Sequence, residues 1–199
     1  MGKSIDNRKN IKLVLVCMLI LALILAAVLL AIERMGSSSE VMAENSVDTV
    51  DVNMMEIDDS ADHAKELYDS RVEDINDTAA VADLLKVMDL ESIAGKFTTT
   101  IAEENGVQVL SVSVATGVQK TDKRTFDDNM TKCSQQLMAL MPAIGKIQWI
   151  YPLISAGAED ESVTVSIDTA GASEQLKDDI SAYGKSAASF EKLLKEQAE

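Results

Sequence analysis

The stretch FTTTIAEENGVQVLSVSVA, residues 97–115, decides the fold of this chain. Asn105-Gly106 near its middle is typical of a type I′ two-residue turn, in which both residues need a positive φ. Folding the stretch about this turn pairs Glu104 with Val107 and brings apolar side chains to one face and hydroxyl side chains to the other. The apolar face pairs Phe97 with Val114, Thr99 with Val112, and Ile101 with Leu110, and the hydroxyl face holds Thr98, Thr100, Ser111 and Ser113. The pattern therefore predicts a half-buried antiparallel hairpin.

The segments around the hairpin predict helices and two more strands. Residues 125–141 repeat apolar side chains at helical spacing, and the buried face of this helix is predicted to contain Phe126, Met130, Cys133, Leu137 and Leu140. Residues 147–153 predict a third strand, and residues 163–168 alternate strictly between apolar and polar side chains, as in a fourth. Further helices are predicted from about Ala61, and from an N-cap at Asp77 or Thr78 to just before Gly95. Two closing helices are predicted near the C-terminal end, the first with Leu176, Ile180 and Tyr183 and the second with Phe190, Leu193 and Leu194, and Ser186 is the expected cap between them. Short loops between successive strands predict an α+β domain with a small antiparallel sheet of about four strands covered by helices.

A second stretch, Leu13–Ile32, predicts where the chain is placed. It is an apolar run of 20 residues without charge, Pro or Gly, and as a helix it would span roughly 30 Å, the thickness of a bilayer's hydrocarbon core. The residues before it carry four basic side chains against one acid. The positive-inside rule therefore predicts a single-pass signal-anchor in the cell membrane, with residues 1–12 as a basic cytoplasmic tail and residues 33–199 outside. A cleaved signal peptide ending at Val41-Met42-Ala43 is the alternative, although its apolar region would be only ~7–15 residues long.

Residues 33–62, between the apolar stretch and the first predicted helix, are acidic and only weakly periodic. Nine acidic residues stand against Arg34, and a Gly36–Ser39 segment opens the stretch. We predict an acidic flexible stalk over residues 33–62 and an extracytoplasmic α+β domain over residues 63–199. A short edge strand is the alternative for the part of the stalk that contains Val50, Val52, Met54 and Ile57.

The charge of the chain excludes some partners. The whole chain has a formal net charge of −15, and since residues 1–12 contribute +3, the part after the apolar stretch has a net charge of −18. Nucleic acids and anionic lipid headgroups are bound by basic surfaces. We therefore predict no nucleic-acid partner, and contact with the membrane only through residues 13–32.

The sequence holds no recognisable catalytic or metal-binding set. His63 is the single histidine, so a Ser-His-Asp or Cys-His arrangement would depend on this residue. Cys133 falls on the apolar face of its predicted helix, which indicates a buried thiol. Clustered ligands for zinc and a glycine-rich phosphate loop are missing from the sequence. We predict no enzyme, no cofactor and no catalytic, cofactor-binding or metal-binding residues; a carboxylate-dependent enzyme is the least favoured alternative.

Two groups of side chains are candidates for contacts with a ligand or partner. Trp149 and Tyr151 fall on one face of the third predicted strand, where they either line a ligand groove or pack in the core. The hydroxyl face of the hairpin is either a solvated strand face or a surface that pairs with a partner. Its members are Thr98, Thr100, Ser111 and Ser113.

Residues 68–194 also resemble a known family. The resembling positions are Tyr68, Arg71, Asn76, Asp77, Val81, Leu84, Leu85, residues 137–140 and 147–150, Asp179, Tyr183, Ser186, Phe190, Leu193 and Leu194. With these the chain resembles the bacterial domain of unknown function 4825, which is seen in membrane-anchored proteins of Gram-positive bacteria. It departs from that family by lacking a Pro and a Gly between Arg71 and Asn76. The resemblance implies one extracytoplasmic domain behind one anchor, carries over no catalytic residues, and points to accessories of membrane-bound sensory systems.

These observations together predict a membrane-anchored extracytoplasmic binding or regulatory module of the bacterial cell envelope. Its expected partner is another envelope protein, held near it by the membrane. A small-ligand or cell-wall-binding domain, with Trp149 and Tyr151 as contacts, is the alternative.

Overall fold

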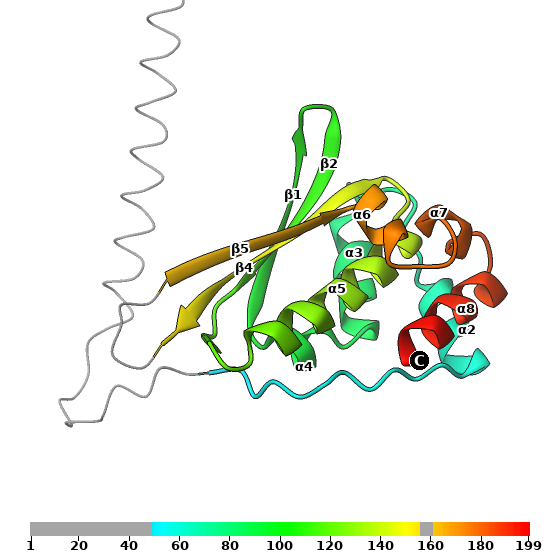
Figure 1. Ribbon diagram of the computed structural model, residues 1–199. Helices are drawn as coiled ribbons and strands as arrows, with labels where there is room; N and C mark the ends of the chain where they lie inside the picture. Colours follow the sequence, from blue (N-terminus) through cyan, green and yellow to red (C-terminus); the bar gives the residue numbers. More distant parts are fainter. Residues whose placement is uncertain (1–48, 156–160) are drawn as a thin grey trace, which may run out of the picture. The chain divides into compact units, whose positions relative to one another are not determined.

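The computed structural model of the protein describes residues 49–155 and 161–199 (Figure 1). The predicted anchor Leu13–Ile32 and the first part of the predicted stalk lie outside these residues. The strands are β1 (Phe97–Glu104), β2 (Val107–Val114), β3 (Val118–Gln119), β4 (Ile144–Ile154) and β5 (Glu161–Asp168). The helices are α2 (Ala61–Asp69), α3 (Thr78–Val87), α4 (Leu90–Ala94), α5 (Lys123–Leu140), α6 (Thr169–Glu174), α7 (Ile180–Tyr183) and α8 (Ala187–Ala198).

The hairpin of β1 and β2 has the register that the sequence predicts. The paired residues run from Phe97 with Val114 at one end to Glu104 with Val107 at the other. Asn105 has a φ of 53° and Gly106 a φ of 83°, which is the left-handed conformation that a type I′ turn requires at both positions. The prediction of the hairpin, its turn and its two faces is therefore confirmed.

The sheet has five strands and is mixed, which corrects the prediction of an antiparallel sheet of about four strands. β2 lies parallel to β4, with Leu110 beside Ile147, and the short β3 lies parallel to the end of β4. β5 pairs antiparallel with the opposite side of β4. The reason is α5, an 18-residue helix between the β2–β3 region and β4. A helical crossover carries the chain back to the end of the sheet where β2 began, so the next strand runs parallel to β2.

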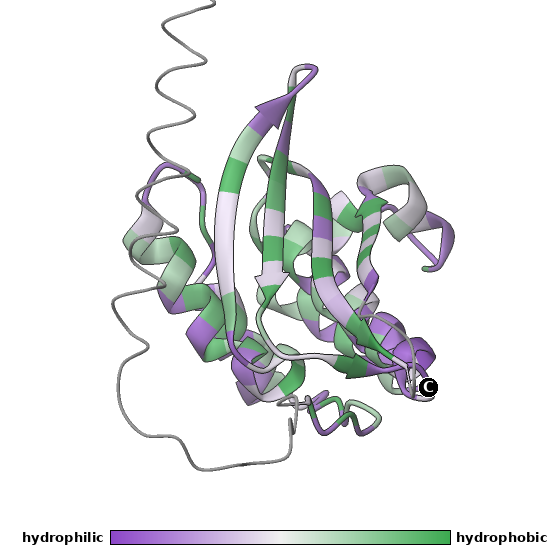
Figure 2. Ribbon diagram, turned by 90° about the vertical axis from the view of Figure 1, so that its left-hand side faces the viewer, coloured by the Kyte–Doolittle hydropathy of each residue, from purple (hydrophilic) through white to green (hydrophobic). Residues whose placement is uncertain are grey.

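Helices cover one face of the sheet and leave the other open. Figure 1 shows the helices to one side of the strands, and Figure 2 views the strands from the open side, with the helices behind them. The covered face carries buried apolar side chains such as Val112 and Ile147. They belong to one core cluster with the buried residues of α5, which include all the predicted ones: Phe126, Met130, Cys133, Leu137 and Leu140. The α+β class and the helical cover are thus confirmed.

Capping residues place several helix ends. The side chains of Asp77 and Ser186 accept hydrogen bonds from first-turn backbone N–H groups of α3 and α8, as predicted. The helix predicted to end before Gly95 is divided into α3 and α4, because Asp89 between them has a left-handed φ of 50°. The first of the two predicted closing helices is shorter than predicted, because only Ile180 and Tyr183 of its residues are helical, in α7, while Leu176 lies in a bend. α6 precedes it and was not predicted, and Asp168 and Asp179 cap α6 and α7.

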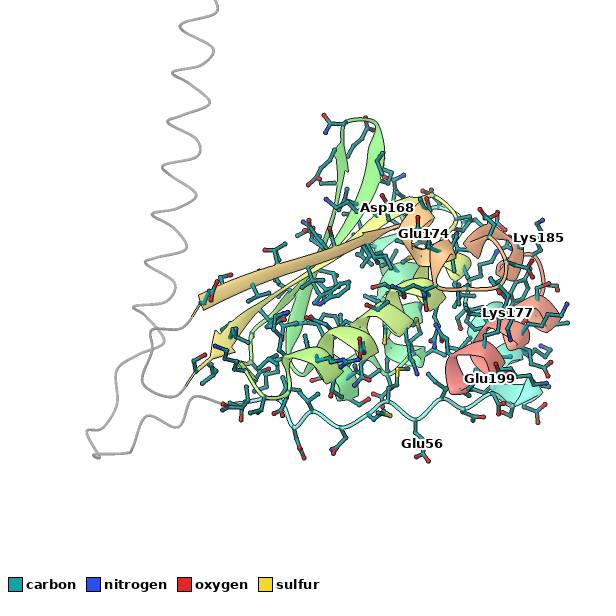
Figure 3. The ribbon with its side chains drawn as sticks, in the orientation of Figure 1. Glu56, Asp168, Glu174, Lys177, Lys185 and Glu199 are labelled. Carbon is teal, nitrogen blue, oxygen red and sulfur yellow. The ribbon has the colours of Figure 1, made fainter. Side chains whose placement is uncertain are left out.

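Residues 49–60, within the predicted stalk, run along the domain as an extended segment that we call the strap. Val50 is buried, and apolar strap side chains pack against the core cluster, namely Val52, Met55 and Ile57. Acidic strap residues are exposed, and Figure 3 shows Glu56 pointing away from the helices. The strap is therefore part of the folded domain rather than a flexible stalk.

Hydrogen bonds tie the strap down at two places. The Val50 N–H donates to the Gly117 carbonyl at 3.0 Å. Beside it, Thr49 and Gly117 form an isolated β-bridge, and the strap does not extend this bridge into the edge strand considered as the alternative. On α5, the Asn129 Oδ1 accepts from the Met55 N–H at 3.0 Å, and its Nδ2 donates to the Asn53 carbonyl at 2.7 Å. One amide side chain therefore satisfies two backbone groups of the strap.

Replacing Asn129 by Ala should loosen the strap. The change leaves the Met55 N–H without its partner, so we expect the free energy of unfolding to fall by about 1–3 kcal/mol. Hydrogen exchange of residues 50–57, followed by mass spectrometry, should become faster. Asn129→Asp keeps an acceptor for the Met55 N–H but places a buried carboxylate oxygen against the Asn53 carbonyl, so it should loosen the strap as well. Unchanged exchange in Asn129→Ala would show that these hydrogen bonds do not hold the strap.

Candidate functional site

Trp149 and Tyr151, the first pair of predicted contact residues, lie in the interior. Both are on the covered face of β4, and each is 1% exposed. The Trp149 indole N–H donates to the Asp127 Oδ1 at 2.9 Å, and the Tyr151 hydroxyl donates to the same oxygen at 3.0 Å. Their polar atoms are thus bonded within the protein, and of the two interpretations open for this pair, packing in the core is the one that the structure shows.

Asp127 is the centre of a small polar cluster that joins α5 to β4. Lys123, one turn earlier on α5, donates to the Asp127 Oδ2 at 2.6 Å, and the Phe126 ring meets the Tyr151 ring edge-on, with 5.0 Å between centroids. Burial, followed by the charge of Asp127, raises the pKa of Tyr151 to about 12. The hydrogen bond to Asp127 raises the pKa of Lys123. Both groups keep their protons at neutral pH and donate hydrogen bonds to Asp127, and the bond from Tyr151 joins α5 to β4.

The second predicted contact surface, the hydroxyl face of the hairpin, does come together on the open face of the sheet. The side chains of Thr98, Thr100 and Ser113 are exposed, and that of Ser111 is half-buried. The Ser111 hydroxyl accepts a hydrogen bond from the Gln148 Nε2 at 2.8 Å. Gln148 lies in turn beside Ser166 of β5. The polar surface therefore continues from the hairpin across the sheet.

A groove that the sequence did not predict lies where β1 meets α3 and α4. We call it the β1–α3 groove, and its volume is about 780 Å³. Its larger apolar lining residues are Ile75, Val81, Leu85, Leu90, Phe97 and Ile101. The helical residues of this set are buried, but Phe97 and Ile101 are only half-buried. A hollow of this size with a mixed apolar and polar lining is typical of binding sites.

β1 presents free backbone groups along this groove. The i→i+3 hydrogen bond of the two-residue turn makes Glu104 and Val107 a hydrogen-bonded pair, and such pairs alternate along an antiparallel ladder. The Lys96 carbonyl, which accepts from the Ala115 N–H at 2.8 Å, continues this alternation at the far end. Every second residue between them turns its N–H and C=O away from β2. This outward row consists of Phe97, Thr99, Ile101 and Glu103. Because β1 is an edge strand, the outward row has no strand partner within residues 49–155 and 161–199.

The charged side chains at the groove are mostly acidic. In the described part of the chain, Lys86 is the single basic residue of the lining, against three acidic ones: Asp89, Glu91 and Glu103. All four side chains are exposed. The groove therefore attracts cationic groups, although screening by salt weakens the attraction.

Among the residues that the structure describes, no group of three or more His, Cys, Asp or Glu side chains could hold a metal ion. Cys133 is buried, its Sγ lies 3.8 Å from the Met55 Sδ, and burial raises its pKa to about 12. It therefore stays a thiol, which is a poor nucleophile. His63 is half-buried and lines a hollow beneath the strap. That the chain has no catalytic or cofactor-binding residues stays a prediction.

No protein-family model, curated protein or solved structure matches this chain. The resemblance to the domain of unknown function 4825 therefore stays a prediction. Within the described ranges, no helix combines the length and the apolar character needed to cross a membrane. The predicted anchor lies outside these ranges.

The free energy of unfolding should fall at alkaline pH. Folded Tyr151 and Lys123 have raised pKa values, that of Tyr151 being about 12. Their contribution is therefore complete below the unfolded pKa of about 10 and is lost as the pH rises through the folded values. Chemical denaturation between about pH 8 and pH 12 should show this loss. Tyr151→Phe should reduce it without removing it, because the pKa of Tyr183 is also raised to about 12. Identical pH dependence in both proteins would contradict this account.

A thiol reagent should label Cys133 only after denaturation. The side chain is 1% exposed, and the reactive thiolate is scarce when burial raises the pKa. Mass spectrometry of the peptide that contains Cys133 separates its labelling from that of Cys17. Cys133→Ser should lower the free energy of unfolding by roughly 1–3 kcal/mol, because it buries a hydroxyl group. Rapid labelling of the native protein would show that this face of α5 is not buried.

Proposed function

We propose that the protein is a membrane-anchored extracytoplasmic binding module of the bacterial cell envelope, and that it binds another envelope protein in the β1–α3 groove. One observation carries the proposal: half-buried apolar side chains and an unpaired strand edge lie together beside a hollow of about 780 Å³. Uncovered apolar surface and free strand edges are both features that proteins cover through association. A partner that fills the groove would cover both at once.

The anchor is supported by the sequence alone. The length of Leu13–Ile32 suits a bilayer, and the four basic residues before it favour a cytoplasmic N-terminus. Two proteins confined to one membrane meet at a high effective concentration. A groove of modest size could then be occupied even if its intrinsic affinity is weak.

The lining of the groove suits binding better than catalysis. It contains no His or Cys within the described residues, and these side chains most often serve as general base or nucleophile at neutral pH. Its uncharged polar side chains include Asn76, Thr78 and Thr99. Amide and hydroxyl groups can donate to and accept from the backbone of a bound segment.

A small-ligand or cell-wall-binding domain is the second candidate, and the open face of the sheet is the observation that favours it. Thr98, Thr100, Ser111 and Ser113 present hydroxyl groups that can hydrogen-bond to the hydroxyl groups of a glycan. The aromatic side chains expected to take part, Trp149 and Tyr151, are buried on the other face. The groove is therefore the stronger site.

Photocrosslinking from intact cells should distinguish the two surfaces. Crosslinking amino acids at Thr99 and Glu103 of the full chain should capture an envelope protein, and those at Thr98 and Ser113, which are exposed on the open face and do not line the groove, should not. Ala82 of α3 is exposed and lines the groove. Ala82→Trp should fill the groove and abolish the crosslinks.

Ala79→Trp is the matched control, because Ala79 is exposed on the same helix but is not part of the groove lining. Its crosslinks should persist. Crosslinks confined to Thr98 and Ser113, or crosslinks from Thr99 that survive Ala82→Trp, would contradict binding in the groove. Capture of cytoplasmic proteins alone would contradict the outward orientation of the domain.

A further inference from the structure

The outward row of β1 and the β1–α3 groove coincide. The side chains of this row, Phe97, Thr99, Ile101 and Glu103, all line the groove, while their backbone N–H and C=O groups face the free edge. A strand laid along this edge would hydrogen-bond to the outward row. It would also place every second side chain over the groove, since side chains alternate along a strand.

β1 lacks most of the features by which edge strands avoid pairing, and its only charged residues, Glu103 and Glu104, stand at its end. It is eight residues long and contains neither Pro nor Lys, and its ladder with β2 continues over all eight residues without a bulge. Edge strands that must stay free are usually short, bulged, covered, or protected by Lys or Pro. An open edge beside a hollow is the arrangement by which peptide-binding domains add an extended segment to a sheet.

The charge at the groove selects among possible segments. The groove lining carries three exposed carboxylates, those of Asp89, Glu91 and Glu103, and one ammonium group, that of Lys86. A segment with Lys or Arg is therefore complementary to the charge of the groove. A second copy of the chain is disfavoured, because its own β1 ends in Glu103 and Glu104 and the whole chain has a net charge of −15. Like charges brought together in this way oppose association.

We infer that the groove takes up an extended segment of a partner protein by strand addition to β1. The segment places apolar side chains beside Phe97 and Ile101 and at least one Lys or Arg beside the acidic residues of the groove. This inference rests on the proposed function and names the chemical class of the segment that is bound.

Synthetic peptides test the inference directly on the full chain in detergent micelles. The basic probe is fluorescein-labelled Lys-Thr-Val-Thr-Val-Thr-Lys, capped at both ends, and the acidic probe replaces both Lys by Glu. A third probe carries N-methyl groups on both Val amides. When the probe runs antiparallel to β1 with its Val and Lys side chains over the groove, these amides face β1, so N-methylation removes two donors of the added strand.

Fluorescence anisotropy should show the basic probe binding at least about tenfold more tightly than the acidic probe. N-methylation should weaken the basic probe by about tenfold or more. Ala82→Trp should abolish binding, and Ala79→Trp should preserve it. Glu103→Gln should reduce the preference for the basic probe. Glu104→Gln is the matched control and should reduce it less, because the Glu104 side chain lies on the opposite face and forms an ion pair with Lys146 at 3.6 Å.

Several results would overturn the inference. These are equal binding of the basic and acidic probes, equal binding of the N-methylated probe, or no binding of the basic probe up to about 1 mM. A dimer of the full chain that excludes the basic probe would assign the groove to a second copy instead. If one of these results is found while groove crosslinks to an envelope protein persist, strand addition by a basic segment fails and the proposed function stands. If the groove crosslinks are also missing, both fail.

Discussion

The Asn105-Gly106 turn is the constraint on which the rest of the structure depends. Side chains alternate along a strand, so the register that the turn fixes decides which of them face the helices. The same register decides which backbone groups of β1 face β2 and which face the free edge. A shift by one residue would send Thr100 to the core and Ile101 to the open face. Two residues with a left-handed φ therefore set both the core and the groove.

α5 extends this constraint to the remaining strands. It returns the chain parallel to β2, and Asp127 in its second turn fastens it to β4 through Trp149 and Tyr151. The aromatic side chains of β4 thus contribute to stability and are not available to a ligand. In the described sheet, β2 lies between β1 and β4, and the remaining strands, β3 and β5, both pair with β4. β1 is therefore the last strand on its side and has a free outer edge. The open edge is therefore a consequence of strand order.

Patterns between neighbours in the chain were enough to predict the hairpin register, the buried face of α5 and the alternation of β5. Features that depend on distant contacts were not predictable in this way. From the sequence the strap was predicted to be part of an acidic stalk, because the residue that binds it, Asn129, is 74 residues away from Met55 in the chain. The sequence of β4 does not separate into an apolar and a polar face, because Ile150 and Pro152 on the open side are apolar too. The groove combines residues of α3, α4 and β1, which only the fold brings together. The feature of the sequence that could have pointed to it is a strand, β1, that contains neither Lys nor Pro.

Residue-resolved hydrogen exchange of the purified full chain tests the central claim, that β1 is an open edge, most directly. Amides of the outward row, such as Thr99 and Ile101, should exchange much faster than those of Thr100 and Ala102, which face β2. The expected pattern is therefore an alternation with a period of two residues along β1. Equal protection of both sets in the isolated chain would mean that the edge is already paired, and would contradict the account.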